Sequence, residues 1–174
     1  MRFHEQLHPV RLVLVLILFA TPTVTIVMAD WPQWRGPNRD GLVSDASIPR
    51  TWPKELKQEW KVTVGVGHSS PVVANGRIYV FARQGDAEVL LCLDSATGKE
   101  VWRSTQPVAY EMHNAARAHG KGPKSTPALY SGYVYTLGIS GVLSCHDTRN
   151  GNLKWRREFS QEYPKTSPLF GTAM

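Results

Sequence analysis

Apolar residues gather in short runs after residue 69, and several of these runs end at a turn residue such as Asn75 or Asp94. The first four runs cover 69–74, 77–83, 88–94 and 100–103. The second run is apolar on both alternating faces, with Ile78 and Val80 on one and Tyr79 and Phe81 on the other. Strands that are apolar on both faces are buried on both faces. The pattern therefore predicts a four-stranded sheet packed between neighbours, and no helix beyond the N-terminal segment.

A second set of four runs follows the first and predicts a second sheet of the same kind. Its runs cover 126–130, 133–138, 142–147 and 153–156. Asn75-Gly76 in the first set and Ser131-Gly132 in the second stand where two-residue hairpin turns are needed. These residue types tolerate the positive φ angles of such turns.

The two sets also share a signature of Asp, Gly and Trp at four-residue spacing, which recurs 53 positions later. The residues are Asp94, Gly98 and Trp102, then Asp147, Gly151 and Trp155. A third copy begins within 167–174. A repeat of fixed period indicates stacked supersecondary units, here the blades of a propeller.

The predicted fold class is all-β, an incomplete β-propeller of four-stranded blades over 57–174. Blade one is placed at 69–103, an insertion at 104–124, blade two at 125–156 and the start of blade three at 167–174. A further strand is predicted over 57–64, around Trp60, in the position of a blade's closing strand. We expect the open ends of such an array to favour association.

Residues 1–29 have the pattern of a signal peptide, with Arg2 and Arg11 before and at the start of an apolar stretch over 12–20. Cleavage is expected after Ala29, which predicts an exported protein, periplasmic or extracellular. The alternative is an uncleaved anchor, which Pro22 weakens. The membrane is therefore expected as a partner only through this segment.

Residues 30–56 form a lead-in without helical or strand period. It contains Trp31, Trp34 and Trp52, whose apolar surface is costly to leave in water. We expect the lead-in to pack flat across the propeller; a binding role for its tryptophans is the alternative.

Charge and cysteine content narrow the function classes. The net charge of +6 is spread over interspersed residues of both signs, without a run of five basic residues, so nucleic acid is not an expected partner.

Cys92 and Cys145 occupy the same repeat position. Equivalent sites in neighbouring blades lie too far apart for a disulfide, so we expect two small buried residues.

The stretch Asp-Ser-Ala-Thr-Gly-Lys-Glu-Val-Trp over 94–102 resembles the PQQ-type β-propeller repeat, and 147–155 is similar with Asn150 in place of threonine. The lead-in over 30–41 and Gly-Pro-Lys-Ser-Thr-Pro over 122–127 also resemble exported PQQ-binding-like and BamB-like propellers. Members of this family carry a full ring of blades in one longer chain. The resemblance therefore implies an N-terminal fragment.

The resemblance allows two functions. Quinoprotein dehydrogenases in the family bind PQQ and Ca²⁺ and oxidise alcohols or sugars, whereas BamB-like members bind proteins without a cofactor. This chain has no adjacent cysteines and no matching Glu–Asn–Asp set. We therefore expect a non-catalytic binding or scaffold module with no evident cofactor and no catalytic residue. The alternative is the N-terminal part of a PQQ-dependent dehydrogenase.

Asp94 and Asp147 are expected to accept backbone hydrogen bonds in turns. Trp102 and Trp155 are expected to pack between blades. Both interpretations assign the repeat signature to the fold.

The insertion and the channel mouth supply the candidate ligand contacts, because excess length in a repeat array maps to a loop. Glu111, His113 and His119 suit zinc by type, although their spacing fits a solvated loop better. A protein or small-molecule ligand is expected at the propeller face. Its expected contacts are His68, Lys124 and Lys165, just before the first strands, with Tyr110 and Arg117 of the insertion.

Overall fold

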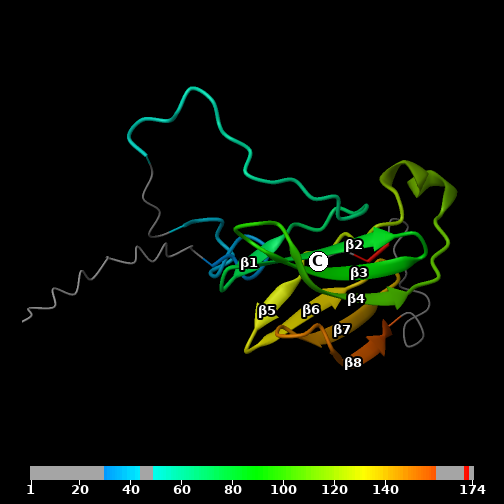
Figure 1. Ribbon diagram of the computed structural model, residues 1–174. Helices are drawn as coiled ribbons and strands as arrows, with labels where there is room; N and C mark the ends of the chain where they lie inside the picture. Colours follow the sequence, from blue (N-terminus) through cyan, green and yellow to red (C-terminus); the bar gives the residue numbers. More distant parts are fainter. Residues whose placement is uncertain (1–29, 44–48, 160–170, 173–174) are drawn as a thin grey trace, which may run out of the picture.

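A computed structural model describes residues 30–43, 49–159 and 171–172. It contains two antiparallel four-stranded sheets that pack face to face (Figure 1). The first sheet has the order β1-β2-β3-β4, with strands Val72–Ala74, Arg77–Gln84, Ala87–Asp94 and Glu100–Pro107. The second has the order β5-β6-β7-β8, with strands Ala128–Tyr130, Tyr133–Leu137, Val142–Asp147 and Leu153–Glu158. The predicted signal peptide and the residues 167–170 lie outside the described residues.

The two sheets share a shift of strand register at the same repeat position. The pairing of β3 with β4 shifts between Cys92 and Leu93, and that of β7 with β8 shifts between Cys145 and His146. Both cysteines are buried and free. The outer strands run further than predicted, because β4 continues to Pro107 and β8 to Glu158. The first four residues of the predicted insertion therefore belong to the sheet.

Two predictions about local structure are wrong. A short 3-10 helix, η1 (Asn114–His119), stands in the insertion, where no helix was expected. Residues 57–64 do not form a strand and pair with neither sheet. Val66, just beyond, bridges to Arg83 of β2.

The core lies on both faces of the first sheet. The face toward the second sheet is a buried cluster of Val72, Tyr79, Phe81, Leu90, Cys92, Trp102 and Val134. The other face carries Val80, Val89, Leu91 and Leu93. Val64 packs on that second cluster, so the segment before β1 covers the face that has no neighbouring sheet among the described residues.

The lead-in joins the inner edges of both sheets. Trp31 exchanges two backbone hydrogen bonds with Val73 of β1, at 2.7 and 3.0 Å, and Leu129 of β5 donates to the Pro32 carbonyl at 2.8 Å. The lead-in therefore pairs with the unpaired edges of β1 and β5, beside which it lies in Figure 1. It does not pack flat as a whole, because Trp34 and Trp52 remain mostly exposed.

Candidate binding site

The side chain of Asp94 is used by its own turn. Its Oδ1 accepts hydrogen bonds from the Thr97 amide at 3.1 Å and the Thr97 hydroxyl at 2.8 Å. Its Oδ2 pairs with Arg77 at 2.9 Å. These contacts, the Thr97 hydroxyl first, lower the pKa of Asp94. The carboxylate is therefore held ionised as a turn acceptor and has no geometry for proton transfer to a ligand.

Asp147 serves the same turn with different partners. Asn150 stands where the first copy has Thr97, so no threonine hydroxyl is available. Arg149 donates to the Asp147 carboxylate instead, from Nη2 at 2.7 Å and from Nε at 3.0 Å. The Lys154 Nζ lies 3.4 Å from the same carboxylate. The hydrogen bonds from Arg149 hold the pKa of Asp147 far below its usual range. Two cations thus compensate a carboxylate that is almost completely buried.

The tryptophans fasten one unit to the next. Trp102 of β4 donates its indole N–H to the carbonyl of Thr148 at 3.0 Å, and its ring lies against Gly151. Trp60 repeats the arrangement one unit earlier. Its indole N–H donates to the carbonyl of Ser95 at 3.1 Å, and a β-carbon on Gly98 would stand 2.6 Å from its ring.

Trp60 therefore occupies the position of a closing-strand tryptophan without being in a strand. Trp155, the third member of the series, is 44% exposed. Its ring lies 6.1 Å from that of Tyr135 in its own sheet.

Two of the predicted channel-mouth residues meet at the backbone carbonyl of His119, one of the zinc candidates. The His68 ring donates from Nε2 to the carbonyl of His119 at 2.8 Å, and Lys124 Nζ lies 3.5 Å from the same oxygen. The His68 amide also donates to the carbonyl of Pro123 at 2.8 Å. Gly122 has no room for a β-carbon, because the backbone of 66–67 passes directly beside it. The insertion is thus anchored to the segment that precedes β1.

The other insertion candidates point elsewhere. His113 caps η1, its Nδ1 accepting the amide of Ala115 at 3.2 Å, while Glu111 and Arg117 are exposed and Tyr110 is half-buried. Within 30–43, 49–159 and 171–172, no three His, Cys, Asp or Glu side chains gather as a metal site would require. The zinc alternative is therefore without support in these residues. Lys165 lies outside them.

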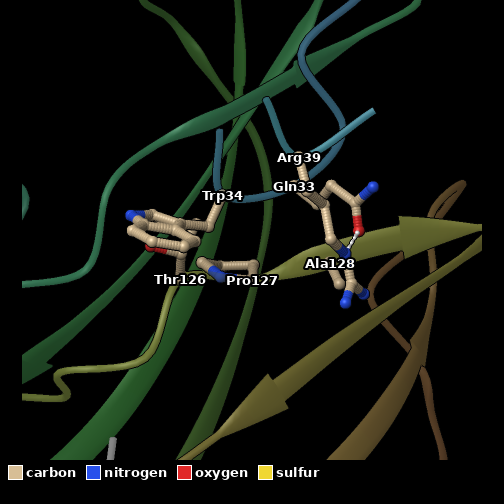
Figure 2. Close-up of a pocket in the computed structure, with 6 residues that line it drawn as sticks. All are labelled: Gln33, Trp34, Arg39, Thr126, Pro127 and Ala128. Carbon is tan, nitrogen blue, oxygen red and sulfur yellow. Dashed lines mark hydrogen bonds between the residues drawn. The ribbon is translucent and has the colours of Figure 1, made fainter. Parts of the chain in front are cut away.

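A pocket of about 260 Å³ lies between the lead-in and β5, and it contains one of the lead-in tryptophans for which a binding role was the alternative. It is lined by Gln33, Trp34, Arg39, Thr126, Pro127 and Ala128. Figure 2 shows the Trp34 ring over Thr126 and Pro127, and the Arg39 side chain reaching toward Ala128. The available signal was the presence of two tryptophans and two arginines within 31–39, but the strand that completes the pocket is far away in sequence.

Known proteins are similar to part of this chain. No family model matches the chain. A BamB outer membrane protein assembly factor from Alteromonas naphthalenivorans is 29% identical over 93 residues, which is 53% of this chain and 21% of that protein. The chain thus spans about a fifth of the curated relative that it matches.

Two solved structures are also similar. Quinohemoprotein alcohol dehydrogenase from Comamonas testosteroni is 28% identical, with a TM-score of 0.36, over 51% of this chain and 12% of that chain. BamB from Moraxella catarrhalis is 18% identical, with a TM-score of 0.34, over 55% of this chain and 23% of that chain.

The two sheets resemble the blades of PQQ-type, BamB-like propellers. The two sheets confirm the all-β prediction. The 29% identity to the BamB relative supports the resemblance. No helix among the described residues is long and apolar enough to cross a membrane.

The two blades also share a buried polar contact. Glu88 of blade one accepts the amide of Ile139 in blade two at 2.8 Å. A β-carbon on Gly138 would overlap this carboxylate, so a larger residue there would have to displace the Glu88 side chain. Burial raises the pKa of Glu88, opposed by the Ile139 amide and by Arg83 and Arg156. Because the contact lies between the blades, we assign it a structural role.

Proposed function

We propose that this chain is an exported, non-catalytic propeller module that binds a protein partner through its insertion loop. One observation carries the proposal: the repeat residues that could act chemically are engaged by the fold. Asp94 and Asp147 accept turn hydrogen bonds, and Trp102 is fixed against Gly151. What remains open to a partner is the loop around η1, where His113, Arg117 and His119 are exposed. Such binding needs no reactive group on the strands, since loops carry recognition on rigid scaffolds.

The residues described do not fit PQQ. Cys92 and Cys145 are buried in separate blades, so they offer no sulfur pair for a quinone to stack on. The Trp102 ring has one side against the next blade, and its N–H is already bonded. The carboxylates that could act as bases are held by arginine and threonine. The dehydrogenase alternative rests on the 28% identity to the quinohemoprotein over half of the chain.

The protein-binding role draws support from the BamB relative, whose name describes an assembly factor. Binding is tested by placing a photo-crosslinking amino acid at Arg117 of the full chain, in a Gram-negative host. The matched control places it at Thr97, which is also exposed but lies in a turn at the opposite end of blade one. We expect one discrete crosslinked protein at Arg117 and none at Thr97. Equal crosslinking at both positions would contradict a loop-directed partner.

The same preparation tests export and catalysis. Intact mass should show a chain that begins at Asp30, as cleavage after Ala29 requires. Incubation with PQQ and Ca²⁺ should give no dye reduction with alcohols or sugars. Cofactor-dependent turnover would favour the dehydrogenase alternative over a binding module.

A further inference from the structure

We propose that the lead-in pocket is a second binding site, for a small organic carboxylate with a flat apolar body. The pocket is the space of about 260 Å³ between Gln33, Trp34 and Arg39 of the lead-in and residues 126–128 of blade two (Figure 2). It is separate from the insertion loop, and it does not depend on the protein-binding role proposed above.

The guanidinium of Arg39 is held in place with its terminal nitrogens unused. Gln33 donates from Nε2 to the Pro37 carbonyl at 2.9 Å and accepts from Arg39 Nε at 3.0 Å. Among the described residues, no acceptor is bonded to the two Nη atoms of Arg39. A fixed guanidinium with free N–H groups matches the two oxygens of a carboxylate. The amide of Gln33 therefore positions the cation that the ligand needs.

A second donor lies on the opposite wall. The Thr126 hydroxyl oxygen accepts the Ser70 amide at 3.2 Å, so its own hydrogen remains available. Thr126 lies in the segment that leads into β5, whose position is fixed by blade two. Donors therefore come from both the lead-in and the blade.

The rest of the lining is apolar and rigid. Pro127 is fully buried, and the indole of Trp34 lies over it. The Arg35 guanidinium lies 5.4 Å from the centre of the Trp34 ring and donates to the Asp40 carbonyl at 3.2 Å. An indole wall fixed in this way suits a flat apolar group better than a flexible one.

The backbone of the lead-in supports a role beyond packing. Arg35 and Arg39 have φ angles of 62° and 61°. Residues other than glycine seldom adopt this left-handed region, and such strain is concentrated at ligand sites. The Arg35 guanidinium lies over the Trp34 ring, which is nevertheless 57% exposed. A large aromatic ring left half in water at the edge of a pocket is explained by a ligand that covers it.

Size and charge define the ligand. A pocket of about 260 Å³ lies just below the range of about 300–1,000 Å³ that is usual for ligand sites, which favours one small molecule. Of the two arginines, only Arg39 lines the pocket. A single cation matches the single charge of a carboxylate and leaves a phosphate dianion undercompensated.

The test uses 4-fluorobenzoate as the probe and ¹⁹F NMR titration of the full chain. We expect saturable binding by 4-fluorobenzoate and at least tenfold weaker binding by 4-fluorobenzyl alcohol, which keeps the ring and lacks the charge. Arg39→Gln should weaken 4-fluorobenzoate at least tenfold, because charge-assisted hydrogen bonds are lost. Trp34→Ala should weaken both probes. Lys121→Gln, which removes an exposed cation that does not line the pocket, should change neither.

Several outcomes would overturn the proposal. They are no saturable binding by 4-fluorobenzoate, equal binding of the two probes, or an unchanged affinity in Arg39→Gln. Displacement of the probe by inorganic phosphate at equal concentration would assign the pocket to phosphate instead. Binding only of a peptide with a free C-terminus would assign it to a protein. Far-UV circular dichroism of each variant separates loss of binding from loss of fold.

Discussion

The indole ring of Trp102 lies so close to Gly151 that no β-carbon fits between them. The two residues belong to different blades, and Gly151 also has a φ angle of 73°, which favours glycine. The glycine of the Asp–Gly–Trp signature is thus required twice, by its own turn and by the tryptophan of the preceding blade. The signature describes a joint between blades as much as a strand within one.

Gly151→Ala should destabilise the protein more than Gly132→Ala does. Both glycines have positive φ angles, 73° and 80°, but a β-carbon added to Gly132 would meet no atom within 4 Å. The backbone cost of about 1–2 kcal/mol is therefore shared. The overlap with Trp102 should add about 1–3 kcal/mol at Gly151 only. Urea denaturation measures both, and equal losses would show that the ring moves aside freely.

Trp102→Ala should cost more than Trp155→Ala. Trp102 is 9% exposed and fastened to blade two, so its truncation should cost about 3–5 kcal/mol. Trp155 is 44% exposed and contacts Tyr135 within its own blade. Its truncation should cost about 1–2 kcal/mol, in proportion to the smaller buried area. Chemical denaturation at one pH compares them, and a loss at Trp155 as large as that at Trp102 would contradict the assignment.

Glu88→Gln should change how stability depends on pH. The folded pKa of Glu88 is raised above its ordinary value of 4.5 by burial. The ionised group therefore lowers stability above its folded pKa, and this cost is relieved as pH falls toward 4.5. As the pH is lowered from neutral to 4.5, the free energy of unfolding of the wild type should rise relative to that of Glu88→Gln. A difference that stays constant over this window, in thermal melts, would mean that Glu88 does not titrate between the blades.

Asp147→Asn should give the opposite slope. The pKa of Asp147 is depressed far below its ordinary value of 3.8, mainly by Arg149. Its ionised form therefore stabilises the fold above pH 3.8, and this contribution fades as pH falls below that value. Wild type should exceed Asp147→Asn in stability at neutral pH, and the gap should narrow below pH 3.8. Arg149→Gln should reproduce part of the loss, whereas a gap that widened in acid would refute the pairing.

The strands with alternating apolar residues could be predicted from the sequence. β7 has its predicted bounds, and β2 and β3 differ by a single residue, because their apolar runs are bounded by turn residues. The inner strands β1 and β5 are shorter than predicted, since Pro71 and Pro127 have no amide hydrogen for the ladder.

The end of β4 and the ligand pocket could not be predicted in the same way. Ser104, Thr105 and Gln106 extend β4 by backbone pairing with β3, which leaves no apolar trace. The pocket arises where Pro32 meets Leu129, a backbone contact between segments almost a hundred residues apart. Periodicity indicates which residues are buried, and it does not indicate which distant edges pair.

The joints between blades have a direction along the chain. Trp60 inserts against Gly98, and Trp102 against Gly151, so each tryptophan is synthesised 38 or 49 residues before its glycine. At a synthesis rate of about 5–20 residues per second, the interval between synthesis of each tryptophan and of its glycine is on the order of 2–10 s. During that time the partner surface of the tryptophan has not yet been made. The joint between Trp60 and Gly98 therefore becomes possible before the joint between Trp102 and Gly151.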